Sequence, residues 1–266
     1  SIGSNPNDGF YLGPGFKYVA HGFKKEPYKF YHQLLVNRAF GSNGYNLYYR
    51  FDYVDVLGKL DFAGKLDYNA PLVYQYYGAG NQTKAELTED QTELFDVRME
   101  NFYFSPSLKL ASKSQSQKLN LSFNFQRVDF EDSDLNDFFI KSTSEDFIGA
   151  SLSYSYSNVD NTLNPNRGLK LAATGTWTTS ANDSGVEYYQ VGTELSLFFP
   201  ISLVQKQVTL GVRSGVYSNF GDYVFFQANF LSGFDNFRGV LRNRFAGETS
   251  QFNNLDLRIS LLKVRS

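Results

Sequence analysis

Residues 45–68, YNLYYRFDYVDVLGKLDFAGKLDY, decide the fold of this chain because apolar and polar side chains alternate along most of the stretch. From Tyr45 to Tyr53 the odd-numbered positions are aromatic or leucine, while most even-numbered positions carry asparagine, arginine or aspartate. After Gly58, leucine and phenylalanine alternate with lysine and aspartate up to Tyr68. A period of two residues is typical of β-strands. The stretch therefore predicts two strands, joined by a short turn, that share one apolar face and one charged face.

The same alternation recurs along the chain and predicts an all-β protein. Phenylalanine and tyrosine number 26 and 19, while methionine occurs once, a composition that favours strands over helices. We expect eleven strands, over residues 10–22, 29–40, 45–53, 60–68, 94–110, 119–126, 148–156, 169–177, 186–198, 207–216 and 252–263.

The composition excludes several other classes of protein. With a mean hydropathy of -0.36, no stretch approaches the roughly 18 apolar residues of a membrane-spanning helix. A net charge of -2 gives no reason to expect a nucleic-acid partner. The chain has no cysteine, and His21 and His32 lack a further ligand at metal-binding spacing, so we expect no metal or other cofactor. The opening SIGSNPNDGF lacks the features of a signal peptide, so an exported protein would be represented here in mature or trimmed form.

The connections between the expected strands alternate in length. Short turns lie near Pro27, Gly58, Ser114, Pro165 and Ser202, whereas the long connections are residues 69–92, 131–146 and 219–250. Short turns on one side and long loops on the other are typical of an up-and-down antiparallel β-barrel in an outer membrane. We therefore predict a transmembrane β-barrel, with its long loops on the extracellular side.

The charged face of such a barrel is expected to line the interior. Eleven strands enclose a space too wide for side chains to fill, so inward apolar residues would leave a void. The apolar face then points to lipid. The expected lumenal charges are Arg50, Lys65, Arg98, Glu100, Glu194, Arg213 and Asp256, which either line a path for substrates or form ion-pair ladders across strands.

The longest connection contains an unusual concentration of arginine, aromatic residues and glycine. Residues 231–258 read LSGFDNFRGVLRNRFAGETSQFNNLDLR, with the candidate site residues Phe237, Arg238, Gly239, Arg244, Phe245 and Gly247, followed by an alternating strand that carries Asn254, Asp256 and Arg258. An arginine inside a barrel gains charge-assisted hydrogen bonds from lumenal acids, and glycine would let the backbone pass close to the wall. We expect Arg238 to hold this loop in the lumen. The alternative is a solvated surface arginine.

These motifs resemble the BamA/TamA type of outer-membrane assembly factor, the bacterial surface antigen superfamily, in which an arginine of a V-R-G-F/Y motif sits on a long extracellular loop folded into the barrel. Phe237 and Val240 depart from that motif. The turn with Asn164, Pro165 and Gly168 is similar to the family's periplasmic P-T-x-G turn.

The resemblance has further implications for the organisation of the chain. It implies that residues 1–266 are one partial barrel domain, approximately strands 2–12 of sixteen, and that the acidic partner of the loop arginine lies after residue 266. Residues 5–9 and 76–81 resemble a subgroup in which a calcineurin-like phosphoesterase domain precedes the barrel.

The resemblance implies a barrel that assists insertion or translocation of proteins at the bacterial outer membrane. Its implied partners are membrane lipids, nascent outer-membrane proteins and accessory assembly subunits. No nucleophile elbow, phosphate loop or spaced pair of acids appears, so we do not expect an enzyme. The alternatives are a membrane anchor or exporter for a fused phosphoesterase or phospholipase and, disfavoured because the loop would obstruct the lumen, a diffusion porin.

Overall fold

The computed structural model describes residues 2–5, 9–23, 25–83, 96–130, 144–182, 185–203, 206–233 and 235–259. Within these ranges the chain consists of strands, their connections and one short 3-10 helix, η2 (Phe225–Gln227). The strands are β1 (Ile2–Asn5), β2 (Gly9–Leu12), β3 (Gly15–Gly22), β4 (Lys25–Ala39), β5 (Tyr45–Leu57), β6 (Leu60–Gln75), β7 (Asp96–Ala111), β8 (Gln117–Phe130), β9 (Ser144–Val159), β10 (Gly168–Ser180), β11 (Glu187–Leu203), β12 (Lys206–Asp222), β13 (Asn229–Leu231), β14 (Phe245–Gly247) and β15 (Thr249–Ile259). No helix in the described ranges is long and apolar enough to cross a membrane.

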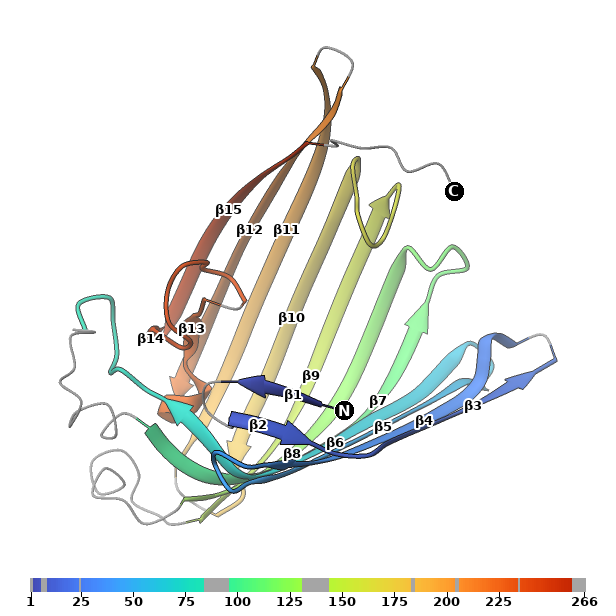
Figure 1. Cartoon of the computed structure of the whole chain (residues 1–266). Coiled ribbons are helices and arrows are strands. Elements are labelled where there is room, and N and C mark those ends of the chain that lie inside the picture. Colours follow the sequence, from blue (N-terminus) through green and yellow to red (C-terminus); the bar gives the residue numbers. More distant parts are fainter. Residues whose placement is uncertain are drawn as a thin grey trace.

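One antiparallel sheet contains all the long strands. Its order is β1-β2-β4-β5-β6-β7-β8-β9-β10-β11-β12-β15, and β3 also pairs with β4. From β4 to β12 each strand pairs with the strands next to it in sequence, so the topology is up-and-down. β13 and β14 form a separate small sheet within the connection between β12 and β15. Figure 1 shows the large sheet curved into an open trough, with β13 and β14 on its concave side.

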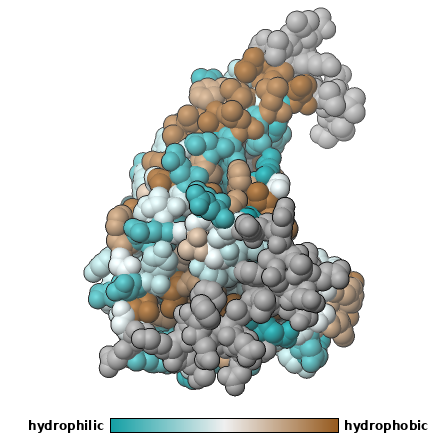
Figure 2. Space-filling view, turned by 90° about the vertical axis from the view of Figure 1, so that its left-hand side faces the viewer, coloured by the Kyte–Doolittle hydropathy of each residue, from teal (hydrophilic) through white to brown (hydrophobic). Residues whose placement is uncertain are grey.

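The two faces of the sheet differ as the alternation predicts. On β8 the exposed residues Leu119, Leu121, Phe123 and Phe125 share one face. On the other face Asn124 accepts hydrogen bonds from Tyr103 and Ser105 and donates one to Ser151 on β9. We call these the apolar face and the polar face. Figure 2 shows hydrophobic and hydrophilic side chains gathered in separate areas of the visible surface. Exposed apolar residues on a sheet whose other face is hydrogen-bonded are the pattern of a membrane barrel, so the predicted fold class is confirmed.

Most strands extend past their predicted ends, and residues 94–95 and 260–263 of the predicted strands lie outside the described ranges. Three other differences concern the number and the register of the strands. The first expected strand is divided at Gly13 and Pro14 into β2 and β3, because proline has no backbone N–H to donate to the ladder. β6 continues to Gln75, past the predicted end at Tyr68, with a register shift between Asn69 and Leu72. β1, β13 and β14 were not predicted, since three or four residues are too few for alternation to be recognised.

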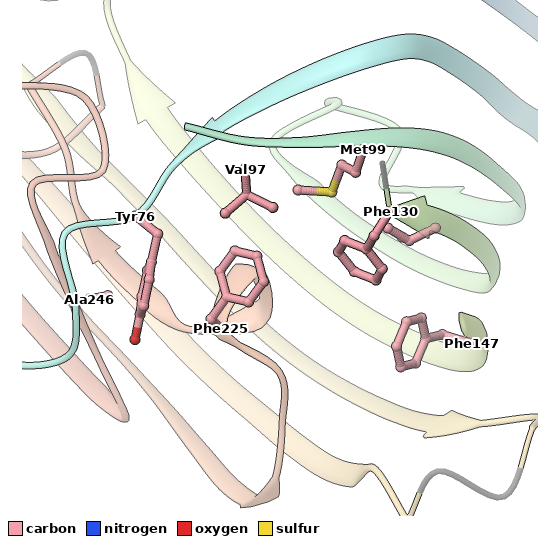
Figure 3. Packing of buried hydrophobic residues seen from close by; sticks show 8 residues of the cluster. Tyr76, Val97, Met99, Phe130, Phe147, Phe225 and Ala246 are labelled. Carbon is pink, nitrogen blue, oxygen red and sulfur yellow. The ribbon is translucent and has the colours of Figure 1, made fainter. Parts of the chain in front are cut away.

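A cluster of buried apolar residues lies at the end of the sheet where the long loops are. Val97 and Met99 on β7, Val128 and Phe130 on β8 and Phe147 on β9 pack with Tyr76, Phe225 and Ala246. Figure 3 shows these side chains pointing toward one another from the strands and from the loops. The polar face thus becomes apolar near the loop end, where segments distant in sequence cover it.

Candidate functional site

The connection between β12 and β15, residues 223–248, folds back over the polar face (Figure 1). We call it the folded loop. Its base is held by Asn219, which is fully buried and donates a side-chain hydrogen bond to the Gln227 carbonyl over 2.9 Å. Gln190 on β11 donates to the side-chain oxygens of both Asn219 and Asn229, each over 3.0 Å. Side chains of β11 and β12 therefore hold the first turn of the folded loop.

Arg213 on β12 connects the wall to the middle of the folded loop. Its Nε and Nη2 donate to Oε1 and Oε2 of Glu194 over 2.7 and 2.8 Å, a bidentate ion pair. Its Nη1 donates to the Asp235 carbonyl over 2.8 Å, and the guanidinium lies 5.0 Å from the centre of the Phe252 ring. Because Glu194 fixes the plane of the guanidinium, the third donor is aimed at the loop backbone. No sequence motif marks this arginine as an anchor, since no motif residue adjoins it.

Arg238 lies over the polar face and pairs with a carboxylate on β15. Its Nη1 donates to Oδ1 of Asp256 over 3.0 Å, and the two side chains are 82% and 45% exposed. An ion pair this exposed contributes only about 0–1 kcal/mol. The further acidic partner that the resemblance places after residue 266 stays a prediction.

The expected reason for Gly239 was wrong. Among the residues that the structure describes, no atom outside its chain neighbours lies within 4 Å of the position its Cβ would take, so the backbone does not pass close to a described strand there. The φ angle of Gly239 is 90°, in the region where glycine is favoured. Phe237 next to Arg238 is 42% exposed, and its ring centre lies 6.4 Å from that of Phe245.

The second half of the predicted loop cluster faces a different partner. Phe245 and Gly247 belong to β14 and pair with Leu231 and Asn229 of β13. Arg244 contacts Thr83, in the connection that follows β6. The structure thus separates Arg244, Phe245 and Gly247 from the ion pair of Arg238.

The three predicted polar residues of β15 lie on the polar face but serve two ends of the sheet. Asn254 donates to the Asn236 carbonyl of the folded loop over 3.1 Å, and Asp256 pairs with Arg238. Arg258 instead reaches the β9–β10 turn at the other end of the sheet. Its Nη1 and Nη2 donate to Asn164 Oδ1 and to the Pro165 carbonyl, each over 2.7 Å.

The β9–β10 turn is a rigid element. Asp160 Oδ1 accepts the backbone N–H groups of Asn166 and Arg167, and these bonds hold the pKa of the Asp160 carboxyl below its usual range. Gly168 opens β10 with a φ of 113°, and a Cβ there would lie 1.9 Å from the Asn158 carbonyl oxygen, so only glycine fits. Thr209 on β12 donates to the Asn166 side chain over 2.8 Å. The turn is therefore tied across the polar face to β12 and β15.

The expected set of lumenal charges requires one correction. Arg50, Lys65, Glu194, Arg213 and Asp256 lie on the polar face, where Arg50 is in register with Lys65, and Arg213 with Ser196 and Asn254. Arg98 and Glu100 lie on the apolar face. They alternate with Val97 and Met99 of the buried cluster, and Glu100 accepts a hydrogen bond from Tyr68.

A cavity of about 240 Å³ lies between the folded loop and strands β11, β12 and β15, beside Arg213. It is lined by Glu194, Arg213, Tyr217, Asn229, Asp235 and Phe252. Among the residues that the structure describes, no group of three histidine, cysteine or acidic side chains could hold a metal ion. The arrangement suits a polar lining that holds a loop, with charges paired and donors directed at backbone carbonyls.

Comparison with known proteins agrees with this architecture. The family model described as the Omp85 superfamily domain matches residues 35–251 of the 266. The crystal structure of BamA from Haemophilus ducreyi lacking POTRA domains 1-3 is similar to this chain, with a TM-score of 0.64, 14% sequence identity and 91% of this chain covered. The match covers 45% of that chain, so the present chain spans less than half of its length. No curated protein matches the sequence.

Proposed function

The chain belongs to the Omp85 superfamily, a family of bacterial outer-membrane barrels, and from this premise we propose that it helps to insert or translocate other proteins at that membrane. The observation that carries the proposal is the folded loop, which Arg213 and Asn254 hold by its backbone on the polar face. Such a loop would obstruct free diffusion through the interior, which disfavours a diffusion pore. A barrel that handles polypeptides can use such a loop to govern access to its interior.

The domain organisation follows from the same premise. We propose that the long strands, from β2 and β3 through β15, occupy positions 2–12 of a sixteen-stranded barrel, and that residues 1–266 lie within that one domain. The similarity to the BamA structure over 91% of this chain supports a single domain of that fold. In this arrangement the sites named above take no part in a chemical reaction, and the role of the segment is not enzymatic.

The proposed partners follow from the surfaces. The apolar face, with Leu152, Leu195 and Leu255 exposed, suits membrane lipid. The proposed polypeptide partners are nascent outer-membrane proteins, whose unpaired strand edges need a protein surface because unpaired backbone groups are costly in lipid. We also propose accessory assembly subunits as partners, and the only support for them is membership of the family.

Depletion of the protein in its own bacterium tests the proposal. We expect the amounts of folded outer-membrane barrels to fall, measured by quantitative proteomics of outer membranes and by the heat-dependent gel mobility of individual barrels. Re-expression of the full-length protein should restore them. Barrels that assemble at normal levels after depletion would contradict the proposal and favour an anchor or exporter for a fused enzyme.

A further inference from the structure

Residues 76–83, YYGAGNQT, follow β6 and meet the folded loop on the concave side of the trough. We propose that this segment is a latch that holds the folded loop in place, and that Arg244 is the residue that positions the loop on it. The latch leaves β6 and the folded loop leaves β12, and β7 to β11 lie between these strands in the sheet. The contact therefore spans the trough.

The backbone of the latch extends the small β13–β14 sheet. Gly80 N–H donates to the Ala246 carbonyl over 2.7 Å, and Ala79 and Ala246 form a parallel bridge. Adding a short strand to an exposed sheet edge is a common way for one segment to capture another. The φ angles of Gly78 and Gly80 are 91° and 94°, in the region that glycine adopts readily, which accounts for the two glycines in this stretch.

Arg244 clamps the end of the latch. Its Nη1 donates to Thr83 Oγ1 over 2.6 Å, and its Nη2 donates to the Thr83 carbonyl. The guanidinium lies 5.6 Å from the centre of the Tyr77 ring and 4.5 Å from that of Phe245. One arginine thus contacts three side chains and one backbone carbonyl, and its cation–π contacts come from both segments.

Aromatic contacts between the start of the latch and the loop complete the joint. The Tyr74 hydroxyl at the end of β6 donates to the Phe226 carbonyl over 3.3 Å. The Tyr76 and Phe225 ring centres are 5.0 Å apart. Beside these contacts lies a cavity of about 330 Å³ lined by Tyr76, Ala79, Tyr223, Phe225 and Ala246. Protein cores are packed with few voids, so this joint can separate at less cost than a filled core.

A cysteine pair tests the geometry of the latch without reference to function. The chain has no cysteine, so Ala79→Cys with Ala246→Cys introduces the only thiols, at two residues that share a β-bridge. We expect the purified, folded double variant to form an intramolecular disulfide under mild oxidation, seen as a gel shift that reductant reverses. Ala79→Cys with Leu163→Cys, whose second position lies in the β9–β10 turn, is the matched control and should not cross-link.

Hydrogen exchange tests the role of Arg244. In Arg244→Ala, peptides covering 76–83 and 229–231 should exchange roughly tenfold faster, as expected for loss of a charge-assisted hydrogen bond. Arg242→Ala, two residues away, should exchange as the wild type does. If Arg244→Ala fails to fold, Thr83→Val removes the hydroxyl acceptor alone and should give a smaller increase. Wild-type exchange in both Arg244→Ala and Thr83→Val, or a cysteine pair that does not cross-link, would overturn the latch.

The use of the latch as a gate rests on the proposed function and is tested separately. The oxidised Ala79→Cys/Ala246→Cys protein, reconstituted in lipid vesicles, should lose assembly activity toward an unfolded barrel protein, and reductant should restore it. Equal activity in both redox states, with the disulfide formed, would overturn the gate. No activity in the wild type would count against the proposed function and leave the cross-link result standing.

Discussion

At the scale of single residues, the arginine that the motif identifies and the arginine that holds the loop most firmly are different. Arg238 has one hydrogen bond to Asp256 and an 82% exposed side chain. Arg213 is 38% exposed, is fixed by both oxygens of Glu194, and donates to the loop backbone. Hydrogen bonds to charged groups contribute about 1.5–3 kcal/mol, whereas exposed ion pairs contribute about 0–1 kcal/mol.

We therefore expect Arg213→Ala to release the folded loop more than Arg238→Ala does. Limited chymotrypsin digestion of the folded protein should cut at Phe237 and Leu241 several-fold faster in Arg213→Ala, since loss of about 1 kcal/mol raises the open population about fivefold. Arg258→Ala, which removes contacts to the β9–β10 turn, serves as the control. Cleavage of Arg238→Ala at a rate equal to or above that of Arg213→Ala would contradict the prediction that Arg213 is the stronger anchor.

The sequence located the residues of this site better than it located their contacts. Asn254, Asp256 and Arg258 were assigned to one face of a strand because alternation determines sidedness, and the structure places them there. Alternation says nothing about what crosses above a face. The contacts of Arg258 with Asn164 and of Arg244 with Thr83 join segments 94 and 161 residues apart, which only the folded chain brings together.

At the scale of elements, the central parts of strands were predictable and the loop ends of β7, β8 and β9 were not. Alternation gives the wrong side for Arg98 and Glu100 because they alternate with Val97 and Met99, which are apolar and would therefore be expected to face lipid. Those apolar residues face inward because Phe225 of the folded loop packs on them. The sequence of β7 alone does not indicate that Phe225, distant in the chain, packs on it.

Adjacent residues of β9 give a direct test of the two faces. Leu152 is 52% exposed on the apolar face, and its neighbour Ser153 points to the polar face opposite Asn120 and Thr174. Leu152→Arg should reduce the free energy of unfolding in lipid vesicles by about 2–4 kcal/mol, the cost of a lipid-facing arginine near the midplane. Ser153→Arg should cost much less. Similar losses for both, measured by denaturant titration with tryptophan fluorescence, would contradict the assignment of faces.

At the scale of the whole molecule, the three longest connections all leave the same end of the sheet, together with the shorter connections 40–44 and 181–186. The connections 76–95, 131–143 and 223–248 leave one end, and the turns 58–59, 112–116 and 160–167 leave the other. This is the parity that the sequence predicted. The predicted turn positions at Pro27 and Ser202 are an exception, because Pro27 lies within β4 and Ser202 within β11.

Single cysteines in the otherwise cysteine-free chain test which end faces outward. We expect Asn182→Cys, in the connection between β10 and β11 at the loop end, to react with a membrane-impermeant maleimide on intact cells. Leu163→Cys, 96% exposed in the β9–β10 turn, should react only after the outer membrane is permeabilised. The reverse labelling pattern would invert the proposed orientation.

The tie between the β9–β10 turn and β15 has a consequence for the order of folding. The β9–β10 hairpin needs only local contacts, but its turn receives the two hydrogen bonds of Arg258 from 94 and 93 residues away. Contacts at such separations form late, because a long chain segment must be closed first. The amides of this turn should therefore gain their last protection after β15 has paired with β12. In a pulse-labelling hydrogen-exchange experiment, the time at which these amides become protected would report when β15 has paired with β12.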